Sequence, residues 1–206
     1  MTKEHRALVL FDIDGTLVRR AGPHHRAALV QGIRRVTGLD TTTEGIPVQG
    51  MLDPDILKAA ERYYLRVCPE LSAKHCPGVV PVLERLTRRG VLLGLVTGNL
   101  TRIGWRKLER AGLHGYFRFG AFGEMAKNRA GLARLAIREA RAHGWIDLGA
   151  AVSLIGDAPQ DIQAARANQI RAISVKTGIT PVEELETLQP DLLLTDLREL
   201  RLHMVE

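Results

Sequence analysis

Two aspartates, Asp12 and Asp14, stand two residues apart, directly after an apolar run and directly before a Gly-Thr pair. The run is rich in residues that favour strands and is closed by a turn signal, so residues 7–11 are expected to form a buried strand. Side chains at alternate strand positions share one face, which would place both carboxylates together at the strand end. Crowded carboxylates repel each other unless a cation or a shared proton lies between them. This strand end is therefore expected to carry chemistry.

A second segment, Thr97, Gly98 and Asn99, follows the apolar run 91–96 and precedes an expected helix at 101–111. A hydroxyl and free backbone amides at a helix N-terminus form a site suited to an anion. A threonine before a helix is more often a cap or turn residue, so this segment alone is weak evidence for binding.

A third segment places Asp157 after the apolar run 152–155 and Asp161 four residues later, on an expected helix at 160–168. Positions four apart on a helix are neighbours, so the two carboxylates would lie close together. An aspartate near a helix start can also act only as a cap or a partner of the helix dipole. Both interpretations are open for this pair taken alone.

Strand and helix patterns alternate over most of the chain, and residues 190–206 are expected to add a last strand and a closing helix. Such alternation predicts a three-layer, doubly wound α/β fold with a parallel sheet and helices on both faces. Ligands of such sheets bind beyond the carboxyl ends of the strands. The other expected strands are 172–175 and the short runs 117–119 and 192–194, and the other expected helices are 79–89 and 130–143.

Residues 17–78 break this alternation. They hold helical stretches at 26–37 and 54–68 with no convincing core strand between them. We expect a small helical cap domain at 17–78, inserted after the first strand into a core domain of residues 1–16 and 79–206. Such an insertion would lie over the carboxyl end of the first strand.

The composition of the 206 residues, 45% hydrophobic and 25% charged, is that of a globular protein. The net charge is +6, but the arginines are scattered along the expected helices, which favours a solvated surface over a nucleic-acid partner. Cys68 and Cys76 form neither a metal pattern nor a disulfide framework. No apolar stretch is long enough to span a membrane. We expect a cytoplasmic protein without nucleic-acid or membrane partners, acting as a monomer or a weak homodimer.

Taken together, the segments resemble the haloacid dehalogenase superfamily of phosphohydrolases. The resemblance is carried by residues 12–16, 97–99 and 156–161, which follow the order and spacing of the family over residues 7–175. It implies a Rossmann-like α/β core. The helical stretches within 17–78 are similar to the cap of the phosphoglycolate phosphatase and β-phosphoglucomutase-like branch.

The cation that the family places before its penultimate helix has two candidates here. Lys127 fits the usual spacing, but Asn128 follows it where the family often has proline. Some similar branches use arginine, which favours Arg129. Either cation could neutralise a substrate phosphate, and an arginine would do so through a planar fork.

The resemblance implies a Mg²⁺-dependent phosphatase acting on a small phosphorylated metabolite. Asp12 would attack phosphorus to form an aspartyl-phosphate, and Asp14 would protonate the leaving oxygen and then activate water. Asp12, the main-chain carbonyl of Asp14 and Asp157 would hold Mg²⁺, with Asp161 orienting them. The phosphoryl oxygens would be bound by Thr97, Gly98, Asn99 and either Arg129 or Lys127.

Two other functions are open. A phosphomutase of the same fold would need a cap that excludes water, and a catalytically idle regulatory or binding protein would keep the fold without turnover. The intact set of site residues disfavours the idle protein. The substrate is not specified, because Met51 and Leu52 are apolar where the family's cap loop often carries a cation or threonine. Packing between cap helices is the favoured interpretation of this pair.

Overall fold

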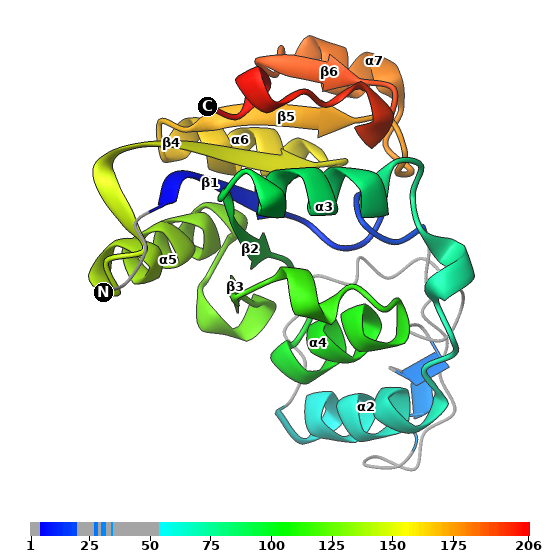
Figure 1. Cartoon of the computed structure of the whole chain (residues 1–206). Helices are drawn as coiled ribbons and strands as arrows, with labels where there is room; N and C mark the ends of the chain where they lie inside the picture. The colour runs from blue at the N-terminus through cyan, green and yellow to red at the C-terminus, as the bar shows by residue number, and fades with distance from the viewer. Residues whose placement is uncertain (1–4, 20–26, 29, 32–33, 35–53) are drawn as a thin grey trace.

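The computed structural model describes residues 5–19, 27, 28, 30, 31, 34 and 54–206. One sheet of parallel strands runs through the molecule in the order β3-β2-β1-β4-β5-β6 (Figure 1). The strands are β1 (His5–Phe11), β2 (Leu92–Val96), β3 (Phe119–Ala121), β4 (Ile146–Gly156), β5 (Arg171–Val175) and β6 (Leu192–Leu194). The winding direction reverses between β1 and β4, and a ligand of such a sheet binds at that point, beyond the strand ends.

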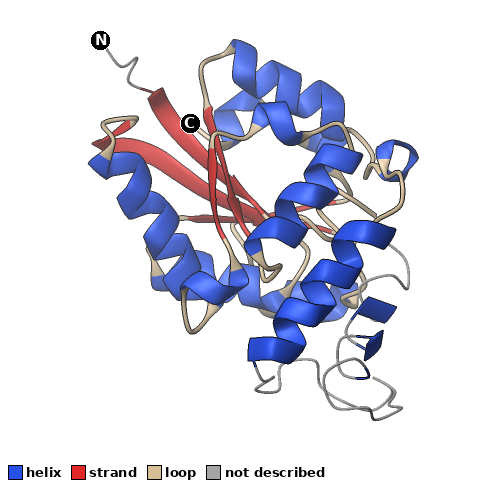
Figure 2. Cartoon of the chain, turned by 90° about the horizontal axis from the view of Figure 1, so that it is seen from below, coloured by secondary structure: helices blue, strands red, loops and turns tan. Residues whose placement is uncertain are grey.

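Helices cover both faces of the sheet, so the expected three-layer α/β fold is confirmed (Figure 2). Alternate residues of β1 enter two separate hydrophobic clusters. Val9 and Phe11 pack with α3 and α4, whereas Leu8 and Leu10 pack with α5 and α6. The helices are α2 (Pro54–Val67), α3 (Val79–Arg88), α4 (Thr101–Arg110), α5 (Arg129–Ala142), α6 (Pro159–Ala167) and α7 (Val182–Thr187).

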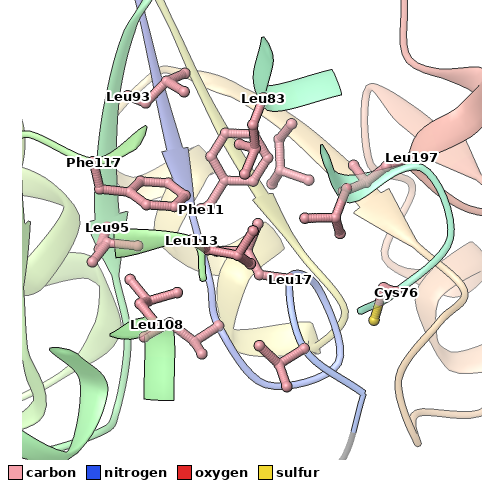
Figure 3. Packing of buried hydrophobic residues seen from close by; sticks show 14 of the residues in the cluster. Phe11, Leu17, Cys76, Leu83, Leu93, Leu95, Leu108, Leu113, Phe117 and Leu197 are labelled. Carbon is pink, nitrogen blue, oxygen red and sulfur yellow. The ribbon is translucent and has the colours of Figure 1, made fainter. Parts of the chain in front are cut away.

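Tight packing fixes the end of β1, from which the two aspartates project. Phe11 is fully buried and meets the edge of Phe117 at a centroid distance of 6.0 Å and an interplanar angle of 78°. Leu17, just beyond the aspartates, is also fully buried in this cluster (Figure 3). An aromatic pair of this geometry adds to the free energy of area burial, so the strand end is held rigidly.

Most expected elements lie within a few residues of their predicted bounds, but three differ. Strand β4 begins at Ile146 instead of 152, and the short helix α7 has no counterpart among the expected elements. The expected closing helix is wrong, because residues 197–199 and 202–204 form separate 3₁₀ turns after β6. Leu197 and Leu200 are nevertheless fully buried, so these turns close one face of the core as a helix would.

The chain leaves the core and returns to it at adjacent points. The amide of Arg19 donates to the carbonyl of Lys74 at 2.7 Å, and the amide of Cys76 donates to the carbonyl of Leu17 at 3.2 Å. Between these points, the expected helix at 54–68 is confirmed as α2.

Helix α2 lies beside α4 of the core (Figure 1). An ion pair joins them, with 3.1 Å between Arg102 Nη1 and Glu61 Oε2. Met51, Leu52 and most of the expected helix at 26–37 lie outside the described residues. A separate cap domain at 17–78 therefore stays a prediction.

Candidate active site

Three buried carboxylates meet at the point where the winding of the sheet reverses. Asp12 follows β1, Asp157 follows the neighbouring strand β4, and Asp161 lies in the first turn of α6. Each offers an oxygen within 4.8 Å of the others. All three side chains are almost completely buried. Oxygen ligands gathered in this way are the donor set of a hard divalent cation.

Two glycines leave the space that the Asp157 carboxylate fills. A Cβ atom at Gly178 would lie 1.7 Å from Asp157 Oδ2, and one at Gly15 would lie 2.4 Å from the same atom. Gly15 also has a positive φ of 87°, which side chains rarely adopt. The hydroxyl of Thr177 donates to the Gly15 carbonyl and ties the loop after β5 to the loop after β1.

The burial of these acids is electrostatically unfavourable. Burial, followed by the charge of Asp12, raises the pKa of Asp157 to about 7. Burial raises the pKa of Asp161 to about 8, against the lowering effect of Arg129. It also raises the pKa of Asp12, again opposed by Arg129. A bound divalent cation would reverse this imbalance, because its charge favours the ionised carboxylates.

Of the two candidate cations, Arg129 reaches this cluster. Its Nη1 lies 3.1 Å from Asp12 Oδ1, and its Nε lies 2.9 Å from Asp161 Oδ1. Arg129 begins α5, and Asn128 caps that helix by accepting a hydrogen bond from the amide of Gly131 at 2.8 Å. Lys127 is exposed.

A second network surrounds Asp14. The side-chain amide of Asn99 donates to Asp14 Oδ2 and to Thr97 Oγ1, both at 2.8 Å. Lys107 of α4 donates to both Asp14 oxygens, at 2.7 and 2.6 Å, and to Asn99 Oδ1 at 2.8 Å. Lys107 has no counterpart among the predicted site residues. The available signal was a lysine within the apolar stripe of an expected helix, beside Ile103 and Leu108.

Most of the side chains in the carboxylate cluster and in the network around Asp14 line one cavity of about 920 Å³. The described residues that line it include every predicted site residue except Lys127 and Asp161. Asp14 has a side chain that is 39% exposed, and Gly98 is exposed as well. The cavity is therefore lined by the buried carboxylates of Asp12 and Asp157, and by a hydroxyl, an amide and a half-exposed carboxylate.

Comparison with known proteins agrees with this geometry. Residues 7–168 match the haloacid dehalogenase-like hydrolase family. The chain is 31% identical over 183 residues to a phosphoglycolate phosphatase of Synechococcus elongatus, a match that covers 87% of this chain and 69% of that relative. It is 28% identical over 209 residues to a phosphoglycolate phosphatase of Agrobacterium fabrum, covering 92% and 88%.

Solved structures show the same fold. CbbY from Rhodobacter sphaeroides in complex with phosphate aligns with a TM-score of 0.75 and 22% identity, covering 97% of this chain and 98% of that one. A putative β-phosphoglucomutase from Thermotoga maritima aligns with a TM-score of 0.62 and 19% identity, covering 91% and 93%.

The chain belongs to the haloacid dehalogenase-like hydrolases, and its curated relatives include phosphoglycolate phosphatases. It is an enzyme, a hydrolase whose curated relatives are phosphatases. Within the part of the chain that the structure describes, no helix is long and apolar enough to cross a membrane.

Proposed function

We propose that this protein is a Mg²⁺-dependent phosphatase that hydrolyses a small phosphomonoester through an aspartyl-phosphate on Asp12. The observation that carries the proposal is the buried cluster of Asp12, Asp157 and Asp161, with Arg129 placed against Asp12. Three acids with raised pKa values need a cation to be ionised together near neutral pH.

The residues present fit Mg²⁺. Asp12 and Asp157 would ligate it through carboxylate oxygens and Asp14 through its main-chain carbonyl, while Asp161 would hold Arg129 and orient the cluster. When bound, the ion would supply positive charge to the phosphoryl oxygens and to the attacking carboxylate. Arg129 already neutralises part of the negative charge of Asp12 and Asp161.

The protein side chains divide the proposed reaction into two displacements. In the first, a bond forms between an Asp12 carboxylate oxygen and phosphorus, the ester P–O bond breaks, and the leaving oxygen takes a proton from Asp14. In the second, Asp14 takes a proton from water as that water attacks phosphorus, which releases Asp12 and phosphate. Thr97, the amide of Gly98, and Arg129 would bind the phosphoryl oxygens during both steps. Asn99 would fix the orientation of Thr97 and Asp14.

The proposed substrate is a small phosphorylated metabolite, either phosphoglycolate or a sugar phosphate. Two curated relatives are phosphoglycolate phosphatases. A mutant of the structurally similar CbbY was solved in complex with xylulose-(1,5)bisphosphate. A cavity of about 920 Å³ has room for either class of compound. We further propose that residues 17–78 form the cap that selects the substrate, on a chain that works as a monomer or weak homodimer.

The experiment that tests this proposal is release of inorganic phosphate from p-nitrophenyl phosphate and from a panel of phosphorylated metabolites. We expect turnover with Mg²⁺, loss of turnover in EDTA, and recovery when Mg²⁺ is restored in excess. Phosphate release that EDTA leaves unchanged would contradict the metal site. Absence of phosphate release from every ester in the panel would contradict the phosphatase, and isomerisation of a sugar phosphate instead would favour the phosphomutase.

A further inference from the structure

Lys107 is the one lysine among the buried polar residues of the described chain, and the reaction proposed above does not use it. It lies on the core-facing side of α4, and its side chain is only 1% exposed. Burying an ammonium group is costly unless the charge is paired and its protons are hydrogen-bonded. Lys107 meets both conditions, because its charge is paired with the Asp14 carboxylate and its protons are donated to Asp14 and Asn99.

The hydrogen bonds of the ammonium group are directed at the proton-transfer residue. Lys107 contacts both oxygens of Asp14, at 2.7 and 2.6 Å, and the carbonyl oxygen of the Asn99 side chain, at 2.8 Å. An ammonium group has three protons, so these contacts use its full donor capacity. The lysine therefore fixes Asp14 directly and also through Asn99.

Asn99 extends this network to the phosphate-binding segment. Because its carbonyl oxygen accepts from Lys107, its amide nitrogen must face Asp14 and Thr97, to which it donates at 2.8 Å in each case. The Asp14 side chain is thus held from the α4 side while 39% of it stays open to the cavity. A single fixed chain links the proposed acid to the proposed phosphate site.

Helix α2 shields the same ammonium group. The Tyr64 ring is fully buried, and its centroid lies 5.9 Å from Lys107 Nζ, within the range of a cation–π contact. The Lys107–Asp14 contact is accordingly kept from water on the α2 side. Charged hydrogen bonds are stronger where water is excluded.

We propose that Lys107 is a positioning residue that holds the Asp14 carboxyl group in the orientation needed for its proton transfers, to the leaving oxygen when it is protonated and from the attacking water when it is ionised. The inference rests on the proposed phosphatase function and adds one residue to it. Lys107 acts through Asp14 and touches neither the substrate nor the metal. Loss of this constraint leaves the attack by Asp12 in place but weakens protonation of the leaving group.

The test compares leaving groups. For Lys107→Met, kcat/KM for the alkyl phosphate that the wild type hydrolyses fastest should fall about 100-fold, because an alkoxide leaves poorly without a proton. The loss for p-nitrophenyl phosphate should be less than about tenfold, since nitrophenolate leaves without help. Arg110→Met, which removes a half-exposed cation three residues along α4 that contacts Pro69 and Glu70 instead of Asp14, is the matched control and should leave both values near the wild type.

A double-mutant cycle separates positioning from a structural role. In an Asp14→Asn background, Lys107→Met should cost little further activity, because the group through which it acts is already gone. Lys107→Arg keeps a cation and should recover part of the alkyl ester activity, and it replaces Lys107→Met if that variant fails to fold. Equal losses on both esters, or additive losses in the cycle, would overturn the inference. A wild type inactive on all esters would instead refute the phosphatase itself.

Discussion

Two neighbouring cations before α5 show that residue type and spacing alone do not identify which side chain reaches the candidate site. Lys127 and Arg129 both precede α5, and their spacing does not say which one faces the cavity. The structure places Arg129 between Asp12 and Asp161 and leaves Lys127 exposed. The difference arises because α5 begins at Arg129, with Asn128 as its cap, so only Arg129 is carried toward the sheet.

Paired substitutions at these positions test the assignment of the phosphate-binding cation. Arg129→Met should lower kcat/KM for p-nitrophenyl phosphate about 100-fold or more, the usual effect of losing one group that stabilises transition-state charge. Lys127→Met should leave kcat/KM within about twofold of the wild type, as expected for an exposed charge. Thermal melting of both variants in Mg²⁺ checks that the fold is retained. Similar losses in the two variants would refute the assignment.

The other residues of the candidate site also divide into those that could be predicted from the sequence and those that could not. Asp12, Asp14, Thr97 and Asp157 could be predicted because each lies within three residues of the end of an apolar run, and the ends of parallel strands share one edge of a sheet. Lys107 could not be placed in the same way. A lysine in an apolar stripe indicates that another group compensates its charge, but the identity of that partner depends on how α4 packs beside the loop after β1.

At the scale of elements, the loop after β5 completes the site. Its Thr177 and Gly178 pack against Gly15 and the Asp157 carboxylate, although no motif marks them in the sequence. Only the parallel pairing of β4 with β5 brings this loop beside Asp157. Any side chain at Gly178 would have to displace that carboxylate.

Gly178→Ala should therefore weaken metal binding. We expect the Mg²⁺ concentration that gives half-maximal phosphatase activity to rise about tenfold or more, as for other disturbances of groups that orient metal ligands. Gly115→Ala is the matched control, because a Cβ atom at that position would meet nothing within 4 Å. A Mg²⁺ requirement unchanged from the wild type would show that the Asp157 carboxylate does not need this space.

The bounds of a strand could be predicted from the sequence where the strand is buried along its length. Strands β1, β2 and β5 are nearly all buried and could be predicted from continuous apolar runs. Strand β4 begins six residues earlier than expected. This early part of the strand could not be predicted, because Asp147, Leu148 and Gly149 are exposed and form no apolar run. In this stretch only Ile146 pairs with β1, opposite His5, and the register shifts before Ala7 pairs with Ala151.

At the scale of the whole molecule, the buried acids lower stability as the pH rises. The pKa of Asp157 is raised to about 7 from an ordinary 3.8 by burial and by Asp12. The folded protein consequently binds more protons than the unfolded chain between these values, so this contribution to stability is lost as the pH increases through that window. Asp161, with its pKa raised to about 8, acts in the same direction.

Thermal melting in EDTA checks whether the buried Asp157 carboxylate lowers the stability of the metal-free protein at high pH. At about pH 8 the metal-free Asp157→Asn variant should melt at least about 2–4 °C above the wild type, the shift that 1 kcal/mol gives in a chain of this size. At about pH 4 the two proteins should melt closer together, because Asp157 is then protonated in the folded wild type. Added Mg²⁺ should raise the melting temperature of the wild type far more than that of the variant. A variant that is less stable than the wild type at about pH 8 would contradict this account.

The measurement that tests the central claim most directly is the turnover number of Asp12→Asn on p-nitrophenyl phosphate in saturating Mg²⁺. Asparagine keeps the size of the side chain but cannot form the aspartyl-phosphate, so kcat should fall by at least about 10⁴-fold. The melting temperature in EDTA should stay at or above that of the wild type, because the variant buries one carboxyl group fewer. A folded Asp12→Asn variant that keeps more than about 1% of wild-type turnover would contradict catalysis through a phosphorylated Asp12.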